Sequence, residues 1–238
     1  MNIRSLMRHT VLISALCTLL GVPTLAHSTN IFLIGDGYQT GSESFTLNSV
    51  TPPLVGAGVN AGGFTGRIGP RPGPNPPTTP ILFWCAELTE TFGFGTVYNN
   101  YTSAPLGNTI LSQLFTLVGG SASATSTADR SAAFQLAVWE ILFEGGTYGG
   151  LNVSSGNFQA SGNAAAIALA NGWLAALDAG DPATTALFLL SSMGHQDFIT
   201  DTTSPLLLTP EPGSLALLGI GIFGAMFAMR RRTHRASR

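Results

Sequence analysis

The two ends of the chain limit most strongly what it can fold into, because each is an apolar segment beside arginines. Arg4 and Arg8 precede the apolar and small residues of 10–21, and Leu25-Ala26 offers a small-residue cleavage site. This order is typical of a secretory signal peptide, which we assign to residues 1–26. At the other end, an apolar segment over 213–229 is followed by an arginine cluster in 230–238. Only residues 27–209 therefore remain to form a folded domain.

The charges at the C-terminal end predict the orientation of the chain. Arginines next to an apolar span favour the cytoplasmic side of a membrane, so the residues before the span lie outside. The signal peptide predicts the same orientation. We expect an exported protein that passes through an inner-membrane-anchored intermediate, with the helix over 213–229 in the membrane. That segment is shorter than the roughly 20 residues of a full membrane-spanning helix.

A short motif precedes the apolar tail. Pro210, Glu211 and Pro212 stand directly before it, and Arg230, Arg231 and Arg232 stand directly after it. Triplet, short helix and arginine cluster together resemble the PEP-CTERM sorting tail of Gram-negative bacteria that make exopolysaccharide. The tail spans residues 210–238, and the resemblance implies that an exosortase-like protease removes it after about Pro212, which leaves the protein at the cell surface or secreted. The alternative is an ordinary tail anchor.

The central 183 residues are acidic and contain no lysine. Eleven carboxylates face three arginines there, which leaves a formal charge of −8. Such a surface disfavours nucleic acid and anionic membranes as partners. All ten basic residues of the chain are arginines, so Schiff-base chemistry, Ser-Lys catalysis and a Lys-Asn crosslink are excluded.

Cysteine use leaves one thiol in the mature protein. Cys17 lies inside the signal peptide and is lost with it, which leaves Cys85 alone. An internal disulfide is therefore excluded, although an extracellular location would favour one.

Local sequence patterns predict an α+β domain. Short apolar runs between Gly, Ser, Asn and Pro predict strands and turns over 31–55, a buried strand over 81–88 and another strand within 92–101. Glycine and proline density predicts a long surface loop over 56–80. A hydroxyl cap, an acidic first turn and a glycine stop predict a helix over 128–144. Helices are also predicted over 109–118 and, in an alanine-rich segment, over 163–179, and a final strand follows an irregular segment within 187–208.

The central helix carries one unusual residue. It begins after a hydroxyl cap at Ser126 or Thr127 and ends at Gly145. At about 100° per residue, Asp129, Glu140 and Glu144 share one face, and Gln135 lies on the opposite, apolar face. An unpaired buried amide costs roughly 1–3 kcal/mol. Gln135 is therefore expected to be hydrogen-bonded in the core or used chemically.

Two segments resemble the Cys-Gln thioester domains of bacterial surface proteins. They are Phe-Trp-Cys-Ala-Glu-Leu at 83–88 and Phe-Gln-Leu-Ala-Val-Trp-Glu at 134–140, within a region of likeness over about 56–179. The resemblance implies a strand-rich lobe packed against a small helical part, with Cys85 as the thiol and Gln135 as the acyl donor. It also implies a covalent adhesin for an amine- or hydroxyl-bearing surface ligand or an extracellular polysaccharide. Phe134 departs from the family, which has threonine before the glutamine.

Other readings of the same residues remain open. Cys85 and Gln135 also suit a structural or polysaccharide-associated surface protein in which the thiol is only packed. A cysteine hydrolase would pair Cys85 with His195, the one histidine of the mature domain besides terminal His27. We expect no metal site, because the scattered aspartates lack the ligand spacing of a calcium loop. We also expect no multiple-turnover enzyme and no cofactor.

Overall fold

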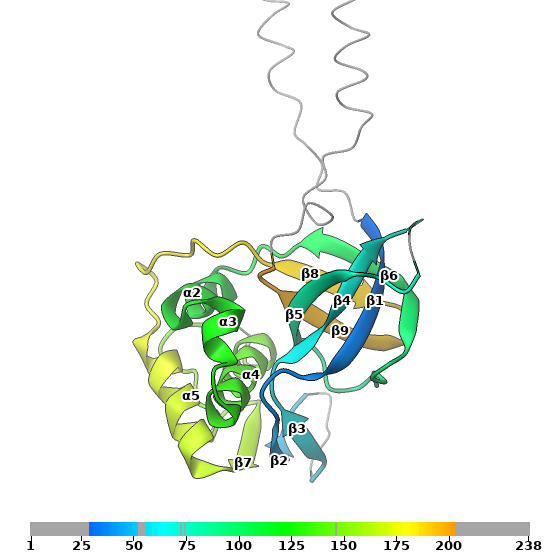
Figure 1. The fold of residues 1–238 in the computed structure, drawn as a ribbon. Helices are drawn as coiled ribbons and strands as arrows, with labels where there is room; N and C mark the ends of the chain where they lie inside the picture. Colours follow the sequence, from blue (N-terminus) through cyan, green and yellow to red (C-terminus); the bar gives the residue numbers. More distant parts are fainter. Residues whose placement is uncertain (1–28, 52–55, 72, 74, 146, 203–238) are drawn as a thin grey trace, which may run out of the picture.

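The computed structural model describes residues 29–51, 56–71, 73, 75–145 and 147–202. In this part of the chain, six antiparallel strands close into a barrel, and the helices pack together on one side of it (Figure 1). The barrel strands, each hydrogen-bonded to the next in this order, are β1 (Thr29–Tyr38), β4 (Phe64–Pro70), β5 (Thr79–Cys85), β9 (His195–Thr200), β8 (Phe188–Ser192) and β6 (Val97–Pro105).

A second, smaller sheet lies beside the barrel. Its strands, in spatial order, are β3 (Gly58–Ala61), β2 (Glu43–Ser49) and β7 (Gln159–Gly162). The helices are α2 (Thr109–Val118), α3 (Gly120–Ala124), α4 (Ala128–Phe143) and α5 (Ala164–Ala176). The predicted α+β class is confirmed, as is a strand-rich lobe packed against helices.

Polar side chains cap three of the helices, and the hydroxyl cap predicted at Ser126 or Thr127 is Thr127. The side chains of Asn108, Thr127 and Asn163 accept backbone N–H groups in the first turns of α2, α4 and α5. These polar caps satisfy donors that no helical carbonyl can reach. The helices predicted over 109–118, 128–144 and 163–179 are therefore present, although α5 ends at Ala176.

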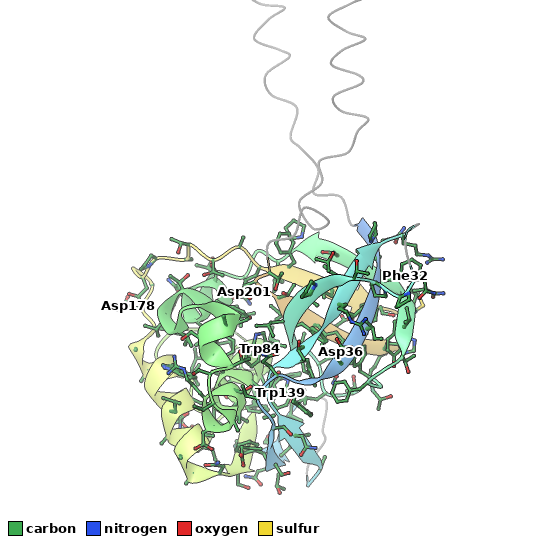
Figure 2. The ribbon with its side chains drawn as sticks, in the orientation of Figure 1. Phe32, Asp36, Trp84, Trp139, Asp178 and Asp201 are labelled. Carbon is green, nitrogen blue, oxygen red and sulfur yellow. The ribbon has the colours of Figure 1, made fainter. Side chains whose placement is uncertain are left out.

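Strand β5 joins the barrel to the helices through alternating side chains. Phe83 packs against Phe198 inside the barrel, with ring centroids 4.8 Å apart. Trp84 points the other way, where its ring lies 4.5 Å from that of Phe134 on α4. Its indole N–H donates to Ser121 Oγ at 2.8 Å. Figure 2 shows Trp84 and Trp139 at this junction. One strand thus contributes to both halves of the core.

The predicted surface loop over 56–80 is wrong for most of its length, because this segment contains β3, β4 and the first residues of β5. Its glycines permit close packing. A Cβ at Gly66 would stand 2.9 Å from the Phe83 ring and closer still to the Ile34 carbonyl oxygen of β1. Glycine inside a strand often marks such a close approach of another backbone.

The last segment also differs from expectation. Residues 187–208 were expected to hold an irregular stretch and one strand, yet the described part forms the hairpin β8–β9. This hairpin lies between β5 and β6 and closes the barrel.

The C-terminal part of the acidic face predicted for the central helix is covered, whereas Asp129 at the other end is exposed. Glu140 is fully buried, and its Oε1 accepts the Asn152 N–H at 2.7 Å. Burial raises the pKa of Glu140 to about 7. One turn later, Glu144 accepts N–H groups of Asn157 and Phe158. Glu140 and Glu144 therefore hold the 152–158 segment against the last turns of the helix.

We expect Gly66→Ala to lower the free energy of unfolding by about 2 kcal/mol or more, because β1 and Phe83 must move to admit a methyl group. Gly58→Ala is the matched control, since a Cβ at Gly58 meets nothing within 4 Å. Urea unfolding of both variants measures the difference. Equal stability of the two variants would show that Gly66 is not needed for close packing.

Candidate functional site

Cys85 is the last residue of β5 and lies beyond the part of β5 that pairs with β4. The β4–β5 pairing begins with Phe64 opposite Phe83, so no β4 residue pairs with Cys85. On the other side β9 continues the sheet, since Phe198 pairs with Cys85 and the Ala86 N–H donates to the Asp197 carbonyl. The backbone groups of Cys85 must find partners elsewhere, because buried N–H and C=O groups are rarely left unpaired.

Gln135 on α4 supplies those partners. The Cys85 N–H donates to Gln135 Oε1 at 2.9 Å, and Gln135 Nε2 donates to the Cys85 carbonyl oxygen, also at 2.9 Å. Both residues are buried, with 2% of Cys85 and 1% of Gln135 exposed. The side-chain amide thus replaces the missing strand residue and holds the two residues, fifty positions apart, in direct contact.

The thiol of Cys85 sits in a buried setting. Its Sγ donates to the Glu87 carbonyl oxygen. Burial raises the pKa of Cys85 to about 12, and the Trp139 indole, the Glu87 backbone and the Gln196 side chain offset part of that rise. The sulfur is therefore a neutral thiol near pH 7, and its reactivity depends on groups that favour the thiolate as it forms.

The connection from β5 to β6, residues 86–96, lies at this end of the barrel. Phe92 from this connection packs on Phe198 with ring centroids 4.8 Å apart. Burial and the nearby carboxylate of Glu90 raise the pKa of both Glu87 and Asp197. The surroundings of the thiol are thus aromatic and acidic, and both properties disfavour a thiolate.

His195 is placed differently from what a hydrolase needs. It lies at the start of β9, with its ring 4.7 Å from that of Tyr98. Among the described residues, no hydrogen bond joins His195 to Cys85, whose polar neighbour on β9 is Gln196. In the described residues, the Cys-His arrangement therefore has no hydrogen bond to support it.

The described residues contain no metal-binding cluster and no helix of membrane-spanning length. In that part of the chain, no cluster of three or more His, Cys, Asp and Glu side chains is arranged to hold a metal ion. Likewise, none of its helices is long and apolar enough to cross a membrane. The signal segment 1–26 and the tail 210–238, with Pro210, Glu211, Pro212 and Arg230 to Arg232, lie outside the described residues.

Comparison with known proteins identifies the tail. A family model described as the PEP-CTERM protein-sorting motif matches residues 208–232, which include the Pro-Glu-Pro triplet and the first three arginines of the cluster. Neither the curated proteins nor the solved structures compared with the chain gave a match. No family match covers the middle of the chain, so its resemblance to thioester domains stays a prediction.

The sorting motif defines the class of protein. The chain is an exported protein directed to the cell surface, and its tail implies processing by an exosortase-like protease. This conclusion agrees with the predicted tail motif and export.

Residues that the sequence analysis missed surround the predicted pair. The Cys85 backbone, rather than its thiol, hydrogen-bonds the Gln135 amide. Gln196 donates to the Glu87 carbonyl that also accepts the thiol proton. Trp139 lies beside the sulfur. Two signals in the sequence indicated it, its place in the 134–140 segment and its position one helical turn after Gln135.

Replacing Gln135 tests its structural contact. In a Cys85→Ala background, where no thioester can form, we expect Gln135→Leu to lower the free energy of unfolding by about 2–5 kcal/mol. Two buried backbone groups lose their partners, at roughly 1–3 kcal/mol each. Gln39→Leu, the same change at an exposed position, is the control and should have little effect. Urea unfolding measures both variants. A loss at Gln135 no larger than at Gln39 would contradict a pairing role for the amide.

Proposed function

We propose that the described domain is the head of a covalent surface adhesin, in which Cys85 and Gln135 form an internal thioester. The observation that carries the proposal is the two-point contact between the Gln135 carboxamide and Cys85, at 2.9 Å for each hydrogen bond. A residue in a strand and a residue in a helix are brought together in a buried setting. That juxtaposition is the first requirement of an intramolecular acyl transfer.

The proposed chemistry joins the Cys85 sulfur to the Gln135 carboxamide, which already hydrogen-bonds the Cys85 backbone. The Cys85 sulfur attacks Gln135 Cδ, the S–Cδ bond forms, and the thiol proton passes to Nε2 as the Cδ–Nε2 bond breaks and ammonia leaves. The Cys85 N–H that donates to Oε1 stabilises the negative charge developing on that oxygen. A single turnover follows when an external amine or hydroxyl displaces the sulfur, so the protein forms one bond and is not a multiple-turnover enzyme.

Burial protects such a bond until a ligand arrives. With 2% of Cys85 and 1% of Gln135 exposed, bulk water has little access to the reacting carbon. The ligand we propose is an amine- or hydroxyl-bearing molecule outside the cell, including an extracellular polysaccharide. The absence of lysine from the chain means that copies of the protein do not acylate one another's lysine side chains.

The second candidate is a non-catalytic surface protein in which Cys85 is a packed thiol. The specific observation in its favour is that Cys85 backbone groups already satisfy both polar atoms of the Gln135 amide. The raised pKa of Cys85 also favours an inert thiol. Mass spectrometry separates the two candidates.

We expect the mature protein, purified from the exporting host in amine-free buffer, to be lighter than its calculated mass by one ammonia molecule. Loss of the Gln135 amino group to the thioester is the physical reason. Intact mass spectrometry measures this difference, and Cys85 in the lighter species should resist alkylation. Methylamine should add at Gln135 and free the thiol.

Matched variants control this experiment. Cys85→Ala should show its full calculated mass and no methylamine addition, because the attacking sulfur is absent. Gln135→Ala should likewise keep full mass and leave an alkylatable Cys85, if it folds. Full mass in the wild-type protein, with Cys85 alkylated after mild unfolding, would refute the adhesin and leave the packed-thiol protein.

We also propose the route by which the tail is used. The apolar segment 213–229 holds an inner-membrane-anchored intermediate with the arginines on the cytoplasmic side. The exosortase-like protease then cleaves near Pro212 and releases the domain over 27–209 outside. The support for this route is the sorting motif at 208–232 together with the basic, apolar N-terminal segment.

Tail processing is tested by the C-terminal peptide of the mature protein. In the native host we expect cleavage near Pro212, so that peptides containing Arg230 to Arg232 are absent from the surface fraction. A variant with Pro210, Glu211 and Pro212 all changed to alanine should keep its tail and stay with the inner membrane. Recovery of the arginine cluster on wild-type surface protein would favour a simple anchor instead.

A further inference from the structure

The indole N–H of Trp139 is a buried hydrogen-bond donor without an acceptor in the described part of the chain. Trp139 is 2% exposed, and its Nε1 has no hydrogen-bond partner among the described residues. Indole N–H groups usually find a partner when buried, because they can donate but cannot accept. Trp84, the other tryptophan of this junction, follows that rule through Ser121 Oγ at 2.8 Å. The unpaired N–H of Trp139 therefore needs an explanation.

The position of Trp139 supplies one. It follows Gln135 by four residues on α4, so the two side chains leave the helix about one turn apart on the same face. The indole lies beside the Cys85 sulfur and lowers the pKa of that thiol. Burial and the negative charge of the Glu87 carboxylate raise the same pKa. In the neutral state the thiol proton is directed to the Glu87 carbonyl oxygen. A neutral sulfur is a weak acceptor, whereas a thiolate accepts a charge-assisted hydrogen bond.

We infer that the Trp139 indole N–H is held for the Cys85 sulfur and donates to it whenever the sulfur carries negative charge. This inference rests on the proposed thioester. The sulfur is negatively charged at two moments, when it attacks Gln135 Cδ and when it leaves that carbon during ligand capture. Trp139 transfers no proton at either step. It lowers the energy of the charged sulfur in both directions, as a fixed donor does when it faces developing charge.

The test compares Trp139→Phe with wild type and with Trp173→Phe, as mature proteins purified from the exporting host. Trp173 is a suitable control because it lies half-buried on α5 under the Arg130 guanidinium. We expect the rate of thioester opening by methylamine to fall about tenfold in Trp139→Phe and to stay unchanged in Trp173→Phe. Intact mass spectrometry against time measures the opening.

The direction of the change separates a donor from a packing residue. A merely structural tryptophan, once shortened, would loosen the core, admit methylamine more easily and speed the opening. Loss of a sulfur donor slows it. An unchanged or faster opening in Trp139→Phe would overturn the inference. If Trp139→Phe does not fold, an isosteric replacement of the indole by benzothiophene removes the N–H and keeps the ring shape.

A second measurement decides the inference even if the wild-type protein contains no thioester. In that case the proposed function fails, and the alkylation rate of the free Cys85 by iodoacetamide at pH 9 becomes the readout. Loss of the donor should lower this rate severalfold, because less thiolate is present at a fixed pH. A looser core would raise it. An unchanged or raised rate, with Trp173→Phe as the reference, would overturn the role of Trp139 independently of the thioester.

Discussion

The two hydrogen bonds between the Gln135 amide and the Cys85 backbone decide how the halves of this domain fit together. Apolar contacts alone would not fix the position of α4 against the barrel, because such contacts tolerate small shifts. An amide with two fixed partners does not tolerate them, since a displacement leaves two buried backbone groups unpaired. The Trp84–Phe134 contact and the Ser121 hydrogen bond lie next to this pairing and depend on the same alignment.

The same pairing would make the proposed thioester compatible with a stable core. Gln135 has a structural role, since it completes the strand edge where β4 does not reach. Its carbonyl oxygen already accepts a backbone donor, which is the arrangement that an acyl-transfer intermediate requires. Because burial raises the pKa of Cys85, its thiol stays protonated near neutral pH. Structure and proposed chemistry therefore use one set of contacts.

Local signals in the sequence predicted a large part of this fold. A hydroxyl cap predicted the start of α4, where Thr127 binds the first turn, and a continuous apolar run predicted β5. The contact of Cys85 with Gln135 followed from a resemblance rather than from spacing, because fifty residues separate them. The role of Gly66 depends on β1 and β5 as neighbours, and strand neighbours cannot be read from one segment. The burial of Glu140 depends on a later segment that folds over it, which helical periodicity does not reveal.

The order of the barrel strands affects when the protein can fold. β8 and β9 come last in the described chain, yet they lie between β5 and β6. Until residues 188–200 have crossed the membrane, β5 and β6 each have one edge without a partner strand. The barrel then remains open, and the long-range contacts that make it cooperative are missing. This topology delays folding until nearly the whole domain has left the cytoplasm, so the chain stays competent for translocation for most of its passage.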